Sequence, residues 1–122
     1  MNVTITELEE GDKEALRRIY LQVRQTNFVW MNGTSFRLLS FDTDTSGEYI
    51  MVARVRDKIA GFVSAWLQDN FIHHLYVDNE YQNKGIGTQL LKRIIPTLKH
   101  PITLKCVKSN TPAIRFYLRN GW

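Results

Sequence analysis

The sequence has only one cysteine, Cys106, among its 122 residues. A single thiol excludes a disulfide within the chain and is typical of proteins in a reducing compartment. No apolar run approaches the roughly 20 residues that a membrane-spanning helix requires. The first residues, Met1 to Thr4, lack the basic and apolar segments of a secretory signal. We therefore expect a cytoplasmic protein that makes no contact with a membrane.

Acidic residues are missing from the last third of the chain. Residues 1–80 contain 8 Lys and Arg against 12 Asp and Glu, whereas residues 81–122 contain 8 Lys and Arg and no acid. A segment of one sign favours an anionic partner, although a solvated basic face has the same composition. These basic residues are not interleaved with aromatics as in single-strand binders, so we expect no nucleic-acid partner.

The length suits one domain, because 122 residues can bury a single core but are too few to divide. Apolar and β-branched runs, most of them alternating with polar residues, predict strands at 3–8, 49–55, 59–67, 71–77 and 102–107. Helical spacing predicts a helix from Asp12 to Thr26, one from Ile86 that stops near Ile95 before Pro96, and a last one from Pro112 to a cap at Gly121. The expected fold class is α/β (α+β), a mostly antiparallel mixed sheet flanked by helices. Residues 28–44 have no clean period and are a candidate wall of an acceptor site.

A glycine-rich turn at residues 82–87 follows an apolar strand and opens a helix. This arrangement gathers free backbone N–H groups at one point, which suits a bound phosphate. Glycines at positions 85 and 87 would let the backbone approach a pyrophosphate closely. A tight strand-to-helix turn without a ligand is the alternative interpretation of the same residues.

Two spaced motifs in this chain resemble the signatures of the GCN5-related N-acetyltransferase (GNAT) family. The first is similar to the family's acetyl-CoA pyrophosphate signature and reads Gln82-x-x-Gly85-x-Gly87. The second reads Asn110-x-x-Ala113-x-x-x-Tyr117 and is followed by Asn120-Gly121-Trp122. Two motifs in the expected order of elements are more specific than either one alone. The resemblance implies a GNAT fold, an acyltransferase activity and acetyl-CoA as the acetyl donor.

The resemblance also implies which residues bind acetyl-CoA. Backbone groups of the strand before the turn would bind the pantetheine arm, and amides of the turn would bind the pyrophosphate. The implied residues are Leu75, Tyr76, Val77, Gln82, Asn83, Lys84, Gly85, Ile86, Gly87, Thr88 and Asn110. Asn110 could equally serve only as a helix-start residue.

Tyr117 is the candidate acid, since amine acetylation needs a proton for the departing thiolate. The resemblance places Tyr117 at the family's tyrosine that points at the sulfur of CoA. A tyrosine phenol is protonated at neutral pH and can donate that proton. A buried tyrosine with a structural hydroxyl is the alternative.

His73 is the candidate base, either directly or through water. Because strand side chains alternate, His73 should share a face with Phe71, Leu75 and Val77, and His74 should point the other way, to the surface or to a helix. By resemblance, Phe71 and His73 fall where arylalkylamine N-acetyltransferases carry paired histidines, and Phe71 falls where histone-type members carry a glutamate. Histidine suits proton transfer near neutral pH. A structural histidine, with water as the base, is the alternative, and no metal site is predicted.

Cys106 is interpreted as a small core residue and not as an acyl carrier, so the amine would attack acetyl-CoA directly. Asp42, Asp44 and Glu48 lie in or beside the irregular segment. They could attract a cationic amine, although acids in polar loops are commonly just solvated. The sequence does not specify the acceptor.

Members of the resembled family normally continue past the second motif into two further strands, whereas this chain ends at Trp122. The expected domain, residues 1–122, therefore lacks the last two strands, and a homodimer partner or swapped element could cover its open sheet edge. The leading hypothesis is an N-acetyltransferase that acts on a primary amine of a small molecule or peptide. The alternative is a catalytically silent acyl-CoA-binding module with an incomplete acceptor site.

Overall fold

The computed structural model describes residues 2–27, 40–104 and 111–122, in which five strands form one sheet. The strands are ordered as in the sequence: β1 (Val3–Glu7), β2 (Tyr49–Val55), β3 (Lys58–Trp66), β4 (Phe71–Val77) and β5 (Thr103–Leu104). Neighbours are antiparallel except β4 and β5, which are parallel. The predicted mixed, mostly antiparallel sheet is therefore confirmed.

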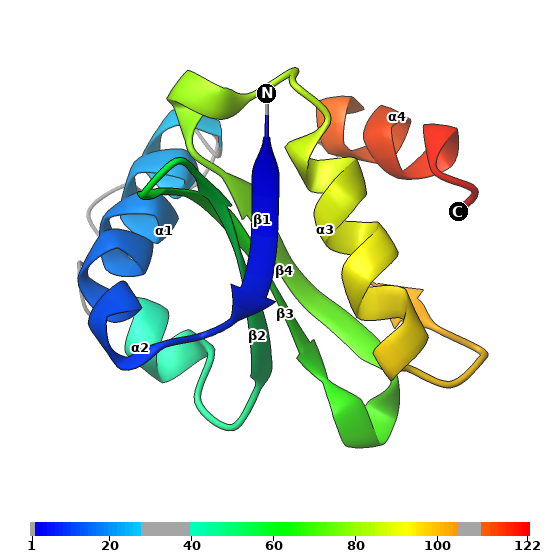
Figure 1. The fold of residues 1–122 in the computed structure, drawn as a ribbon. Coiled ribbons are helices and arrows are strands. Elements are labelled where there is room, and N and C mark those ends of the chain that lie inside the picture. Colours follow the sequence, from blue (N-terminus) through cyan, green and yellow to red (C-terminus); the bar gives the residue numbers. More distant parts are fainter. Residues whose placement is uncertain (1, 28–39, 105–110) are drawn as a thin grey trace.

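Helices cover both faces of the sheet (Figure 1). Helices α1 (Lys13–Asn27) and α2 (Ser40–Asp44) lie on one side, and α3 (Ile86–Ile94) and α4 (Thr111–Arg119) lie on the other. Because side chains alternate along a strand, the sheet supplies apolar residues to both layers. The α1 side buries Leu16, Tyr20, Phe41, Ile50, Val52 and Phe62, and the larger α3 side buries Met51, Val63, Ile72, Ile86, Leu90, Leu91 and Ile94 among others.

Most predicted element ends lie within a residue or two of the observed ones. Helix α3 ends at Ile94, and Pro96 lies in the following 3-10 helix, Ile95–Thr97. Helix α4 ends in a Schellman motif, in which the Trp122 N–H donates to the Tyr117 carbonyl and Gly121 has φ of 92°. The last residues of the predicted strand 102–107 lie outside the described residues. Part of the segment predicted to be irregular, residues 40–44, is the short helix α2.

The histidine pair on β4 departs from the prediction. Ser64 faces His74 and Ala65 faces Ile72, so His73 is an extra residue that bulges out of the ladder. A bulge interrupts the alternation of side chains, and the prediction that His73 and His74 point to opposite faces is wrong. Their ring centroids lie 3.8 Å apart. Leu75 packs instead with the core on the α3 side.

Asp12 does not cap α1 directly but ties the start of that helix to the sheet. Its carboxylate accepts hydrogen bonds from the Arg54 guanidinium of β2 at 2.6 and 2.8 Å, and one from the Glu9 N–H at 2.8 Å. The hydrogen bonds from Arg54 hold the pKa of the Asp12 carboxyl below its ordinary value. Asp12 is buried, so this bidentate pair is a stability element and not a surface ion pair.

Replacing Arg54 by methionine should lower the free energy of unfolding by about 2 kcal/mol at neutral pH, because the Asp12 carboxylate stays buried without its partner. A lowered folded-state pKa contributes stability above the ordinary value of 3.8 that is lost as the pH falls below it. The difference between the two proteins should therefore shrink in acid. Urea unfolding at neutral and acidic pH measures this difference, and the exposed Arg18→Met is the control. An equal loss of stability in Arg54→Met and Arg18→Met would contradict the role assigned to the Asp12–Arg54 pair.

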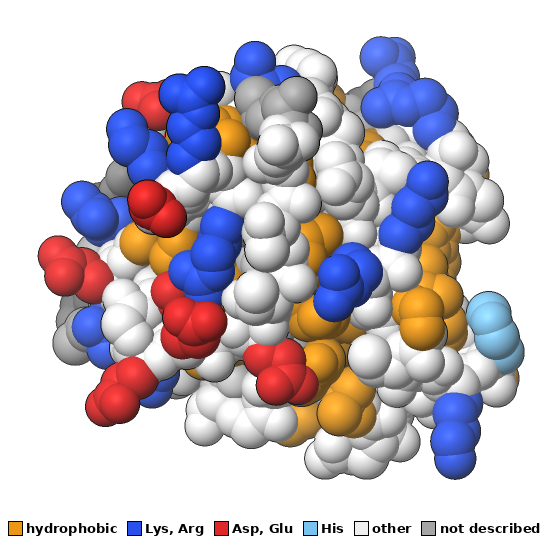
Figure 2. Space-filling view, in the orientation of Figure 1, with side chains coloured by type: hydrophobic (Ala, Val, Ile, Leu, Met, Phe, Trp, Pro, Cys, Tyr) orange, Lys and Arg blue, Asp and Glu red, His pale blue; other side chains and the backbone are white. Residues whose placement is uncertain are grey.

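The charge asymmetry of the sequence is visible on the surface. On the face shown in Figure 2, Lys and Arg side chains without Asp or Glu lie over α3 and α4, while acidic side chains lie on the opposite half. Across the three described stretches, every helix is too short or too polar to cross a lipid bilayer.

Candidate active site

The glycine turn between β4 and α3 adopts the backbone that the sequence predicts for an anion site. Gly85 is the N-cap of α3 and has φ of 81°, a left-handed conformation that favours glycine. Asn83 also has a positive φ, 63°. The first N–H groups of a helix have no acceptor within the helix, and they lie at the positive end of its dipole. The turn therefore presents backbone donors to a ligand.

Two residues of the first motif have structural roles that its spacing does not reveal. The Gln82 side-chain amide donates to the Val77 carbonyl at 3.2 Å and to Asn79 Oδ1 at 3.1 Å, which joins the turn to the end of β4. A Cβ on Gly87 would lie 3.1 Å from Cζ of Phe116. The absence of a side chain at position 87 therefore lets α4 pack directly against the start of α3.

A cavity of about 1270 Å³ extends from this turn along β4. One wall is the turn and β4, another is α4, and residues of α1 also line the cavity. Its lining includes the predicted donor-site residues Leu75, Tyr76, Val77, Gln82, Asn83, Gly85, Ile86, Gly87 and Thr88, together with the candidate acid Tyr117 and base His73. Residues predicted from separate parts of the sequence thus face a single cavity.

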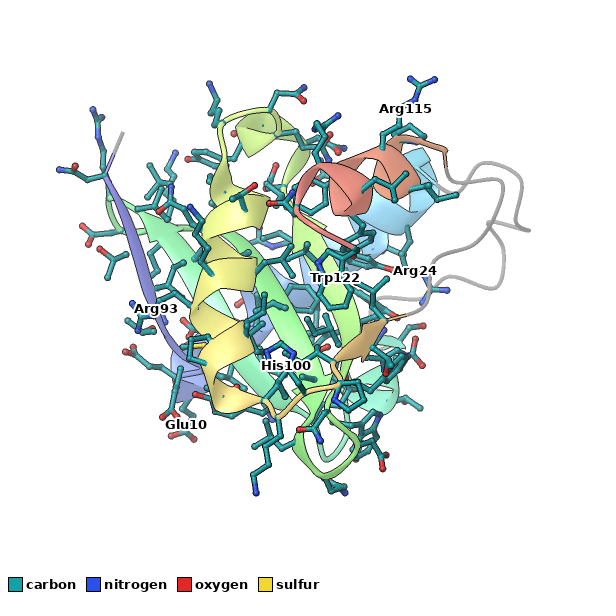
Figure 3. The ribbon with its side chains drawn as sticks, turned by 90° about the vertical axis from the view of Figure 1, so that its right-hand side faces the viewer. Glu10, Arg24, Arg93, His100, Arg115 and Trp122 are labelled. Atoms are coloured by element: carbon teal, nitrogen blue, oxygen red, sulfur yellow. The ribbon has the colours of Figure 1, made fainter. Side chains whose placement is uncertain are left out.

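Helix α4 places Tyr117 on its inner side. The ring centroids of Tyr117 and Trp122 lie 6.4 Å apart, and both side chains pack against the core on the α3 side. Figure 3 shows Trp122 tucked beneath the end of α4, whereas Arg115 points outward from the same helix. Arg115 and Arg119 border the cavity and make this wall basic.

Glu48, at the start of β2, holds the ring of His73. The side chain of Glu48 is fully buried, and its Oε2 lies 2.9 Å from Nδ1 of the half-exposed His73. Burial raises the pKa of Glu48, but its interactions with His74, His73 and Ser64 outweigh burial and lower the pKa overall. The interpretation of Glu48 as a solvated loop acid is therefore wrong, since it is a buried anion beneath His73.

His74 belongs to a buried polar network that reaches α1 and α2. Its Nδ1 lies 2.9 Å from the Ser64 hydroxyl, and its Nε2 lies 3.3 Å from the hydroxyl of Tyr20. That tyrosine donates to Asp44 at 2.6 Å, and Arg24 donates to both Tyr20 and Asp44. Burial lowers the pKa of the His74 imidazole, which favours its neutral form. The prediction that His74 faces a helix is confirmed by its contact with Tyr20.

The acids of the irregular segment are paired and not simply solvated. Arg17 donates to both carboxylate oxygens of Asp42, at 2.8 and 3.2 Å, while Asp44 pairs with Arg24 and borders the cavity. Lys84 is exposed and is not among the cavity-lining residues. Asn110 and Cys106 lie outside the described residues, as does most of the predicted acceptor wall.

The family comparison agrees with this geometry. The model of the acetyltransferase (GNAT) family matches residues 13–122, which is most of the chain. The chain belongs to the GNAT family. No curated protein matches this GNAT sequence.

Solved structures confirm the GNAT fold at low sequence identity. The apo form of YjaB from Escherichia coli is 20% identical with a TM-score of 0.80, and the alignment covers 99% of this chain and 82% of that one. The PaiA N-acetyltransferase of Thermoplasma acidophilum, in complex with coenzyme A, is 19% identical with a TM-score of 0.77, covering 99% and 89%. YncA of Salmonella typhimurium, a putative acetyltransferase with acetyl-CoA, is 22% identical with a TM-score of 0.72, covering 99% and 79%.

Proposed function

We propose that this chain transfers the acetyl group of acetyl-CoA directly to a primary amine of a small molecule or peptide. The observation that carries the proposal is the single cavity that joins the glycine turn, β4, Tyr117 and His73. A donor, an acid and a base can then act on one substrate complex. The coenzyme A and acetyl-CoA complexes of the PaiA and YncA structures support the choice of donor.

The turn and β4 would hold the donor. Amides of residues 84–88 at the start of α3 suit a pyrophosphate, because they combine free N–H groups with the positive end of the helix dipole. Arg115 and Arg119 add positive charge to the opposite wall. Leu75 and Val77 are half-buried residues that line the same cavity, and their backbone groups would hold the pantetheine arm.

Tyr117 and His73 would move the two protons. Tyr117 lies on the cavity side of α4 and would donate to the departing thiolate. The Nδ1–H of His73 donates to Glu48, which leaves Nε2 as the ring nitrogen that can accept a proton from the amine, directly or through water. Glu48 is thus a positioning residue, because it fixes the tautomer and orientation of His73.

Titration with CoA tests the donor site. We expect saturable binding that Gly87→Glu weakens at least tenfold relative to Gly87→Gln, because the two side chains have nearly the same size and differ in charge. Both variants displace Phe116 equally, so the difference between their affinities for CoA reports the repulsion between the carboxylate and the pyrophosphate. Calorimetry measures both affinities. Absence of binding to the unmodified chain, or equal affinities of the two variants, would contradict the proposal.

Release of thiol from acetyl-CoA then separates an enzyme from a binding module. A panel of polyamines, aminoglycosides, amino acids and peptides with free N-termini presents the main classes of primary amine. We expect at least one class to stimulate thiol release. Binding of CoA without stimulation by any amine would instead favour the acyl-CoA-binding module.

A further inference from the structure

Three side chains with metal-ligating atoms gather beside β4, and two of them, His73 and His74, line the cavity. These residues, Glu48, His73 and His74, are called here the Glu48 cluster, and one ligand atom from each lies within 4.8 Å of the others. Two strands supply them, since Glu48 precedes β2 and the histidines lie on β4. The bulge at His73 makes the cluster possible, because regular alternation would point the two imidazoles apart.

The distances within the Glu48 cluster suit a shared metal ion. Oε2 of Glu48 lies 2.9 Å from Nδ1 of His73, and Oε1 lies 3.6 Å from Nδ1 of His74. Tetrahedral zinc binds nitrogen and oxygen at roughly 2.0–2.2 Å, which sets neighbouring ligand atoms about 3.4 Å apart. The two observed distances lie on either side of that value, so small rotations of the side chains would complete the geometry.

An unpaired oxygen points into the same space. The Glu48 side chain is fully buried, and its Oε1 accepts no hydrogen bond from any described residue. A buried carboxylate oxygen without a donor is costly, and a water or an ion can supply the missing partner.

The hydrogen bonds of His74 determine which of its two ring nitrogens faces Glu48. The single hydroxyl proton of Tyr20 goes to Asp44, so His74 Nε2 must be the donor toward the Tyr20 oxygen. In the neutral ring Nδ1 then carries a lone pair, which accepts a hydrogen bond from the Ser64 hydroxyl at 2.9 Å and lies 3.6 Å from Oε1. A metal ion at Nδ1 would therefore have to displace the Ser64 hydroxyl.

The surroundings of His74 match those of a metal ligand. Metal-bound histidines usually donate their other ring nitrogen to a group that fixes the ring, and here Tyr20 and Asp44 provide that support. The half-exposed His73 leaves a route to the cavity by which an ion and a completing water can enter.

We propose that Glu48, His73 Nδ1 and His74 Nδ1 bind one divalent transition-metal ion, for which zinc is the best fit. Two imidazole nitrogens and one carboxylate oxygen favour zinc or cobalt over magnesium and calcium, which prefer all-oxygen sites. Metal at His73 Nδ1 places the ring proton on Nε2, so His73 can no longer accept a proton there. This consequence rests on the proposed function, whereas the metal site itself does not.

Direct binding of Zn²⁺ to the whole chain tests the site without any acetyl donor. We expect calorimetry to give one ion per chain, with an affinity at least tenfold weaker in His73→Ala and in Glu48→Gln. The exposed His100→Ala is the matched control, because it removes the one histidine outside the cluster. A Cys106→Ser background excludes thiol binding. Mg²⁺ should not compete with Zn²⁺.

The outcomes separate a metal ion from His73 alone as the partner of Glu48. No binding of Zn²⁺, or binding that is the same in His73→Ala as in the unmodified chain, would overturn the proposal. Loss of Zn²⁺ binding in His100→Ala would place the ion outside the Glu48 cluster and would also overturn the proposal. If the chain also turns over acetyl-CoA, Zn²⁺ should inhibit it and a chelator should restore it. Failure of turnover alone would contradict the proposed function and not the metal site.

Discussion

Replacing Tyr117 by phenylalanine is expected to lower kcat for acetyl transfer about a hundredfold or more, with little change in the affinity for CoA. The substitution removes only the hydroxyl, and proton donation by a positioned group typically contributes such a factor. The phenyl ring keeps its contact with Trp122, so α4 and the cavity wall should stay in place. Steady-state kinetics with the best amine of the panel, together with CoA titration, measures both quantities.

Tyr81 provides a matched control for this experiment. It also borders the cavity, on the 3-10 helix Asn79–Tyr81 before the glycine turn, and no catalytic role is proposed for it. Tyr81→Phe should keep turnover within about threefold of the unmodified chain, as expected for loss of a single non-catalytic hydroxyl. If Tyr117→Phe turned over as fast as Tyr81→Phe, Tyr117 would not be the acid, and a water molecule would have to supply the proton.

The backbone around the glycine turn was predictable because short sequence segments determine it. Gly85 needs its left-handed backbone, the helix begins just after it, and Pro96 ends that helix within a residue of the expected position. Each of these features follows from the local backbone preference of the residue type at that position. The Schellman motif around Gly121 is a further example.

The placement of the two histidines was not predictable in the same way, because irregular strand pairing determines it. The bulge at His73 has no residue signature such as a glycine, so the alternation rule assigned the two histidines to opposite faces. Glu48 lies close to the two histidines only because of how β2 pairs with β3 and β3 pairs with β4. Each of these pairings contains a register shift. Glu48 lies beside the irregular segment, and acids in such polar segments are commonly solvated, so nothing local in the sequence indicated its contact with the histidines.

The two halves of the cavity also differ in charge. Toward α4 the lining residues Arg115 and Arg119 and the helix start favour an anion, whereas α1 and α2 contribute the ion pair of Arg24 and Asp44. A phosphate-bearing donor would therefore bind toward the glycine turn and α4.

A second large effect is expected at Gly61 on β3, where the backbone of β4 passes closely. A Cβ at this position would lie 2.5 Å from the Tyr76 carbonyl oxygen and 3.1 Å from Val77 Cα. Both atoms are backbone and cannot rotate away as a side chain could. Gly61→Ala should therefore lower the free energy of unfolding by about 3 kcal/mol, at the upper end of overpacking effects.

Gly11→Ala is the matched control for this loss of stability, because a Cβ there has no atom within 4 Å. Its effect should stay within about 0.5 kcal/mol, as is usual for an unhindered surface change. Urea unfolding of both variants gives the comparison, and CoA titration of folded Gly61→Ala should show weaker binding because the end of β4 has shifted. Equal stability of the two alanine variants would contradict the idea that the close contact between β3 and β4 at Gly61 positions the proposed donor site.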